Sequence, residues 1–114
     1  HRDLHSFPTR RSSDLGNVFH AGDGNLHPLI LFDVRDPEEL KRVNALGSAI
    51  LKLCVEMGGT ISGEHGIGVE KLAEMGFIFG AADIELMRAL KRSFDPAGLL
   101  NPGKVLPEPA SRAA

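Results

Sequence analysis

The chain has 114 residues and a mass of 12.3 kDa, the size of one ordinary domain. A formal net charge of −2 disfavours a nucleic-acid or anionic-membrane surface, no apolar run is long enough to cross a bilayer, and the single cysteine excludes an intrachain disulfide. Nine of the 13 glycines fall between Gly16 and Gly68, which marks this region as the one most unlike an average sequence.

Residues 1–15 differ from the rest, because they show no apolar periodicity and no initiating Met. The stretch is rich in Arg and Ser, but it lacks the hydrophobic segment of a signal peptide and the apolar stripe of a transit peptide. It resembles translated adapter sequence left at the edge of assembled reads. We therefore predict a non-native or disordered leader over 1–15, a folded domain over 16–106 and a disordered tail over 107–114.

Two short apolar segments flank a glycine loop after this leader. Val18 and Phe19 precede the loop, and Leu26–Phe32 follows it as an apolar run typical of a strand covered on both faces. Gly22 and Gly24 in the loop disfavour a helix. The pattern therefore predicts two antiparallel strands joined by a turn.

A long helix is predicted to begin at Asp36. Asp36 is suited to cap the helix, Pro37 fits the first helical position, and Glu39 would complete a capping box. Apolar residues then recur at helical spacing as far as Met57, and Gly58-Gly59 ends the pattern.

Three further segments complete the predicted domain. We expect Thr60–Ser62 to form a short strand, Val69–Met75 a short helix, and Ala82–Phe94 a longer helix with one apolar face. The predicted fold class is α+β, with a small antiparallel sheet covered by the two long helices.

His20 and His27 lie at the two ends of the first glycine loop. If the loop folds back as a turn, their imidazoles converge, and neutral imidazole is the commonest metal ligand in proteins, suited to zinc, manganese or iron. The alternative is that both are ordinary polar residues at the ends of a hairpin, where the glycines only supply positive φ. This segment alone leaves both interpretations open.

Glu64 and His65 stand in a second glycine loop, between Gly63 and Gly66. The glutamate would complete a two-His-one-Glu site with an open coordination position, and His65 would then be placed to act as a base. Taken alone, the loop is more simply interpreted as a turn with an exposed carboxylate. Because all three histidines after residue 15 fall in two glycine loops, the sequence as a whole favours a functional site.

Three motifs, in this order, resemble a known family. They are His20–His27 (HAGDGNLH), Ser62–Gly68 (SGEHGIG) and Asp95–Lys104 (DPAGLLNPGK). Over 16–106 the chain is similar to the C-terminal domain of the FAD-linked oxidases that act on 2-hydroxy acids, a family that includes the glycolate oxidase flavin subunit, D-lactate dehydrogenase and D-2-hydroxyglutarate dehydrogenase. The resemblance implies that the chain forms a ferredoxin-like cap domain and is a C-terminal fragment of a larger flavoenzyme.

The resemblance also implies roles for the candidate residues of the two glycine loops. His20, His27 and Glu64 would hold a divalent metal, zinc or manganese, beside FAD. His65 would be the catalytic base that removes the hydroxyl proton of a 2-hydroxy acid, while hydride passes from the C2 atom of the substrate to the flavin.

Further positions follow from the same likeness. Asn25 would bind the substrate acid, and Asn101 and Lys104 would face the FAD. Position 29 is Leu, where relatives that accept a second carboxylate carry a polar residue, which favours a small monoacid such as glycolate or lactate.

The resemblance implies partners as well. An FAD-binding domain of the same protein would lie upstream, and the 114-residue fragment alone is expected to be inactive. Flavin-related and iron–sulfur subunits are implied too, in the cytoplasm or peripherally at the inner face of a membrane, with no nucleic acid bound. A non-catalytic metal-binding or structural module and a metallohydrolase remain as alternatives.

Overall fold

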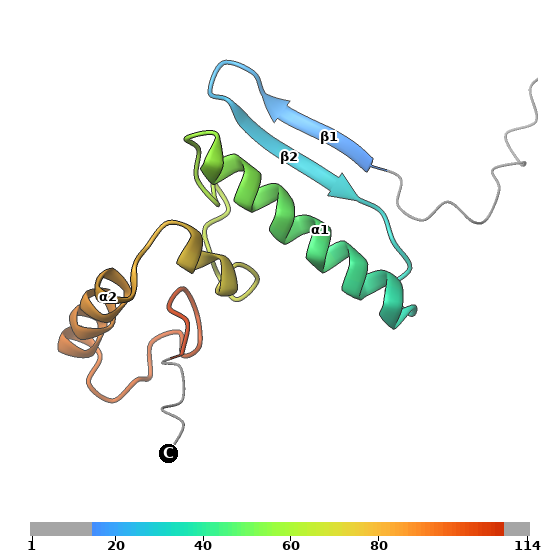
Figure 1. Cartoon of the computed structure of the whole chain (residues 1–114). Helices are drawn as coiled ribbons and strands as arrows, with labels where there is room; N and C mark the ends of the chain where they lie inside the picture. The colour runs from blue at the N-terminus through green and yellow to red at the C-terminus, as the bar shows by residue number, and fades with distance from the viewer. Residues whose placement is uncertain (1–14, 109–114) are drawn as a thin grey trace, which may run out of the picture. The chain divides into compact units, whose positions relative to one another are not determined.

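A β-hairpin is the first element of the computed structural model, which describes residues 15–108 (Figure 1). Strands β1 (Leu15–His20) and β2 (Asn25–Ile30) pair in an antiparallel two-stranded sheet. The register places Val18 opposite His27 and His20 opposite Asn25. The predictions made for 1–14 and 109–114 lie outside the described residues.

Both faces of the hairpin carry exposed apolar side chains. Val18 and Leu29 share one face and are 55% and 52% exposed, and Phe19 and Leu26, on the opposite face, are each 57% exposed. The sequence predicts a strand over Leu26–Phe32 with both faces covered; the strand ends two residues earlier, at Ile30, and side chains on both of its faces are more than half exposed. An isolated pair of strands is marginally stable in water, so this hairpin is suited to a larger sheet.

Helix α1 (Pro37–Glu56) begins where its capping residues predict. The Asp36 Oδ1 atom accepts hydrogen bonds from the backbone N–H groups of Glu38, at 2.9 Å, and Glu39, at 3.2 Å. The second half of the expected capping box differs, because the Glu39 carboxylate accepts its bond from the backbone N–H of Asp33, at 3.0 Å, three residues before the cap.

The end of α1 is set by its two glycines. Gly58 has φ +87° and donates its N–H to the Val55 carbonyl at 2.9 Å, and Gly59 donates to the Cys54 carbonyl at 2.8 Å. This pair of bonds is a Schellman motif, which requires a left-handed residue at Gly58. A Cβ atom at Gly59 would lie 2.9 Å from the Cys54 carbonyl oxygen, so both glycines are needed.

The segment after α1 corrects two sequence-based expectations. Thr60–Ser62 is not a strand: the described residues contain a single sheet of two strands, and Ile61 is buried instead. The short helix expected over Val69–Met75 is a 3-10 helix, η1 (Ala73–Phe77), preceded by turns. Leu72, the residue before η1, already has helical dihedral angles (φ −59°, ψ −41°), and the turns between Gly68 and Leu72 take the place of the expected first helical residues.

Helix α2 (Ala81–Phe94) confirms the prediction to within one residue. The Asp83 carboxylate accepts a hydrogen bond from the Gly80 N–H at 2.9 Å and thereby closes the first turn. Ile84 is buried on its inner face, whereas Leu90 and Phe94, which the sequence places on the same apolar face, are 60% and 81% exposed.

The core lies in the second of two compact units, which among the described residues comprise 15–47 and 48–108. Ile61, Met75 and Ile84 are its buried residues, and Phe79 and Leu106 are among the half-buried side chains packed on them. This core joins the segment after α1 to η1 and α2, and it supports the second glycine loop. Within residues 15–108, no helix combines the length and the apolar character that a membrane span requires.

Candidate functional site

The turn of the hairpin brings the first candidate residues to its end. The Asp23 N–H donates to the His20 carbonyl at 3.1 Å, and Gly24 has φ +68°. A turn closed in this way followed by a left-handed residue is a common connection for a four-residue hairpin loop. His20 and Asn25 then form the pair of the ladder nearest the turn.

The register places the two histidines on one face of the hairpin. Side chains two residues apart along a strand share a face, so Val18 and His20 on β1 lie on the same side as Asn25 and His27 on β2. The two histidines are diagonal neighbours across the strands. Their ring centroids are 5.4 Å apart with an angle of 78° between the ring planes. The predicted convergence of the imidazoles is thus a property of the hairpin itself.

This pair fits the donor set of a divalent metal. His20 is exposed and His27 half-buried, so the imidazoles are accessible from solvent. Two imidazoles on paired strands are typical ligands for zinc or manganese, because the strand register sets their spacing before an ion arrives. The chemistry of the residues present therefore allows a metal at this end of the hairpin.

The second glycine loop displays Glu64 and His65 at the surface of the second unit. The Ser62 Oγ atom accepts a hydrogen bond from the Gly66 N–H at 2.7 Å, which closes the loop around the two residues. Gly66 has φ +77°, a conformation that a residue with a Cβ atom adopts at a cost. The loop is therefore a defined turn that presents one carboxylate and one imidazole.

An open depression of about 460 Å³ adjoins this loop within the second unit. Its lining combines Glu64 and neighbouring backbone with the apolar side chains Ile67, Met75 and Phe79. A carboxylate at the rim of an apolar hollow is a common arrangement in small-molecule sites, in which few polar groups orient a ligand.

The predicted cofactor-binding residues contact each other in the bend near the C-terminus. The Lys104 Nζ atom donates to the Asn101 Oδ1 atom at 3.3 Å, and Asn101 has φ +47°. Asparagine tolerates this left-handed backbone better than most residues do, which accounts for its place in the bend. Both side chains are exposed.

A buried carboxylate that the sequence analysis did not single out holds this bend on α2. Asp95 is 8% exposed and accepts hydrogen bonds from the Lys91 Nζ atom at 2.8 Å and from the backbone N–H groups of Leu99 and Leu100 at 2.9 and 3.0 Å. The hydrogen bond from Lys91, with help from the two N–H groups, lowers the pKa of the Asp95 carboxyl below its ordinary value. A lysine four residues before an Asp-Pro pair is the sequence signal that could have indicated this contact between Lys91 and Asp95.

The seven candidate residues are divided between the two units. The first unit contains the hairpin residues His20, Asn25 and His27, and the second contains the loop and bend residues Glu64, His65, Asn101 and Lys104. Within the first unit the structure brings the two imidazoles together, and within the second it joins Asn101 to Lys104.

Comparison with known proteins places these features in a family. A family model described as FAD linked oxidases, C-terminal domain, matches residues 5–105. The glycolate oxidase subunit GlcD of Escherichia coli K12 is 59% identical over 93 residues, which are 82% of this chain and 19% of that protein. GlcD of Bacillus subtilis is 43% identical over 93 residues, 82% of this chain and 20% of that protein.

A third relative is named for a different substrate. The D-lactate dehydrogenase of Archaeoglobus fulgidus is 42% identical over 107 residues, which cover 85% of this chain and 23% of that protein. The chain thus spans about a fifth of the length of these curated relatives. Since the family match covers most of the sequence, the chain belongs to the FAD-linked oxidases, as their C-terminal domain.

Proposed function

We propose that this chain is the part of an FAD-dependent 2-hydroxy-acid dehydrogenase that holds a divalent metal and supplies the catalytic base. The relatives support the substrate class, because they are named for glycolate and D-lactate, two small 2-hydroxy acids. The chain spans a fifth of those proteins, so the proposal concerns the complete protein and not the fragment alone.

The observation that carries the proposal is the histidine pair of the hairpin. His20 and His27 lie on one face, with ring centroids 5.4 Å apart, on strands whose register fixes their positions. Glu64 is proposed as the third ligand, since a carboxylate from a glycine-flanked loop would complete a two-His-one-Glu set. Three protein ligands would leave a coordination position for a substrate oxygen.

The proposed reaction assigns separate roles to the metal, to FAD and to His65. A divalent metal held by His20, His27 and Glu64 would supply Lewis acidity that lowers the pKa of the substrate hydroxyl, and FAD would supply the acceptor for the C2 hydride. His65, the neighbour of Glu64 in the loop, accepts the hydroxyl proton at an imidazole nitrogen.

Other positions orient the substrate and the flavin in this proposal. Asn25 pairs with His20 and shares its face, so its side chain is suited to bind the carboxylate of the acid. Leu29 follows on the same face, two residues beyond His27, and its apolar side chain favours a monoacid. Asn101 and Lys104 are proposed to face the flavin from the bend that Asp95 holds.

The complete protein is proposed to supply the remaining parts. An upstream FAD-binding domain of the same polypeptide would carry most of the flavin contacts. Flavin-related and iron–sulfur subunits, in the cytoplasm or at the inner face of a membrane, are proposed partners on the strength of the family resemblance.

Replacement of one imidazole tests the metal site in the complete protein. His20→Ala should lower the bound metal, measured by inductively coupled plasma mass spectrometry, and abolish oxidation of glycolate and D-lactate, while the FAD content stays unchanged. Asn17→Ala is the matched control, because Asn17 lies on the same strand with its side chain on the opposite face. Unchanged metal content in the His20 variant would contradict the proposal.

Two further variants separate the ligand from the base. Glu64→Gln should weaken metal binding, whereas Glu70→Gln, a second exposed carboxylate in the turns that follow the loop, should not. His65→Gln should retain both metal and flavin and lose turnover. Full turnover in the His65 variant would favour a non-catalytic metal-binding module instead.

A further inference from the structure

The loop that carries Glu64 and His65 is held at its far end by a distant part of the chain. The Val105 N–H donates to the Gly68 carbonyl at 2.8 Å, across 37 residues of sequence. Ser62 holds the near end through its bond to Gly66. The position of the loop therefore depends on the C-terminal segment as well as on its own glycines.

Val105 makes this bond in a strained backbone conformation. Its φ is +69°, and the Leu106 N–H donates to the Lys104 carbonyl at 2.8 Å, so Val105 is the centre of a γ-turn with positive φ. A β-branched residue rarely adopts this region, because its Cβ atom crowds the backbone. Such a conformation persists only where the surrounding contacts impose it.

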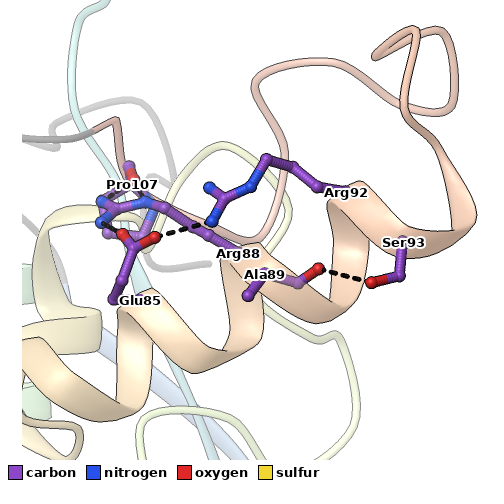
Figure 2. Close-up of polar contacts among 6 residues, drawn as sticks. All are labelled: Glu85, Arg88, Ala89, Arg92, Ser93 and Pro107. Atoms are coloured by element: carbon purple, nitrogen blue, oxygen red, sulfur yellow. Dashed lines mark hydrogen bonds and ion pairs between the residues drawn. The ribbon is translucent and has the colours of Figure 1, made fainter.

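The contact that can impose it lies directly after the turn. The Arg88 Nε atom donates to the Pro107 carbonyl at 3.0 Å, and its Nη2 atom donates to the same oxygen. Figure 2 shows the guanidinium of Arg88 reaching from α2 to this carbonyl. Leu106, between Pro107 and the γ-turn, packs on the buried core. Both residues after Val105 are thus fixed to the second unit.

Arg88 is itself held in place for this contact. Its side chain is 17% exposed, and Glu85, one turn earlier on α2, pairs with it at 3.4 Å. Arg92 pairs with the other oxygen of Glu85 at 2.8 Å, but its side chain is 62% exposed (Figure 2). Hydrogen bonds from the guanidinium groups, that of Arg92 first and that of Arg88 second, hold the pKa of the Glu85 carboxyl below its ordinary value.

We infer that Arg88 is a positioning residue for the Glu64/His65 loop: by fixing the Pro107 carbonyl, it maintains the strained turn at Val105, whose N–H holds Gly68. The inference rests on the proposed function for its catalytic consequence. The structural link from Arg88 to the loop is testable without it.

Amide hydrogen exchange on the complete protein measures that link. In Arg88→Gln, the amides of Val105 and Gly66, whose N–H groups donate the two bonds that hold the loop, should exchange about fivefold faster, the factor that corresponds to loss of one typical hydrogen bond. Arg92→Gln is the matched control, because Arg92 shares the helix, the residue type and the partner Glu85 but does not contact Pro107. Its loop amides should exchange at the wild-type rate.

Two comparisons exclude a general loss of structure. The α2 amides should keep their protection in Arg88→Gln, and Arg88→Lys, which retains a donor for Pro107, should restore part of the loop protection. Equal loop exchange in the Arg88→Gln and Arg92→Gln variants would overturn the inference, and so would loss of α2 protection in parallel with the loop.

Turnover then links the loop to catalysis. Arg88→Gln should lower kcat for glycolate or D-lactate more than it changes KM, with FAD content unchanged, and Arg88→Lys should recover part of kcat. Faster loop exchange with normal kcat would leave the link from Arg88 to the loop intact and would count against the proposed catalytic role of the loop.

Discussion

Gly24 is the position where a small change should separate the two imidazoles. It ends the four-residue loop of the hairpin with φ +68°, directly before the Asn25–His20 pair. A Cβ atom built there would meet nothing within 4 Å, so Gly24→Ala acts through the backbone alone and not through a clash. Any effect on the histidine pair would therefore report the cost of the left-handed turn.

The size of that cost is set by the left-handed backbone. An L-residue other than Asn or Asp pays about 1–2 kcal/mol in this conformation. Because the hairpin has two strands and its apolar side chains are largely exposed, little else holds the turn. If metal binding requires the hairpin as observed, Gly24→Ala should lower the affinity for the divalent metal by about fivefold to thirtyfold, the factor that corresponds to this free energy.

Competition with a chelator on the complete protein measures the affinity, and two variants calibrate it. Gly24→Asn should retain most of the binding, since Asn tolerates left-handed backbone. Gly22→Ala should leave it unchanged, because Gly22 has no positive φ and no atom within 4 Å of the added Cβ. Equal affinities for Gly24→Ala and Gly22→Ala would refute the reasoning that the turn conformation sets the imidazole pair.

Three further predictions concern the stability of the fold. Above its ordinary pKa of 3.8, the ionised Asp95 carboxylate stabilises the fold through Lys91, and this stabilisation is lost as pH falls through its lower folded pKa. Asp95→Asn should therefore lower the melting temperature at neutral pH. Below about pH 4, the melting temperature of this variant should change less with pH than that of the wild type. Gly47 lies in the interior of α1 with open space around an added Cβ, so Gly47→Ala should raise the free energy of opening of α1, measured by amide exchange, by about 1 kcal/mol. Gly58 has φ +87°, so Gly58→Ala should lower the same free energy by about 1–2 kcal/mol. Effects of the same sign would contradict this reasoning. Met75→Ala should lower the denaturation free energy by about 2–5 kcal/mol, and a loss below about 1 kcal/mol would show that Met75 is not a core residue in the complete protein.

Local signals were sufficient to predict the two long helices of the described residues. The Asp36 cap and the two glycines after Met57 define α1, and the apolar periodicity defines α2, because capping bonds and helical spacing depend on near neighbours. Thr60–Ser62 was misassigned for the opposite reason. A strand needs a partner strand, and in the described residues the Ile61 side chain is buried in the apolar core instead.

The geometry of the candidate site, too, was predictable where it depends on near neighbours in the sequence. The hairpin turn and the histidine spacing are local, so the convergence of the two imidazoles could be predicted. The Asp95–Lys91 pair left a local signal in the sequence, since the two residues are four apart. The strained turn at Val105 left none, because it is imposed by the contacts of Leu106 with the core and of Pro107 with Arg88, 19 residues away. The proposed roles of Glu64 and His65 stay predictions, because they depend on the arrangement in the complete enzyme.

The antiparallel register has a consequence for how sequences of this kind can change in length. Asn25 closes the turn opposite His20, and His27 follows two residues later, an even step that returns its side chain to the same side of the ribbon. Inserting or deleting one residue at Leu26 would turn the second imidazole to the opposite side without altering either histidine. Natural insertions should therefore be absent between Asn25 and His27 and tolerated among the loop residues before Gly24.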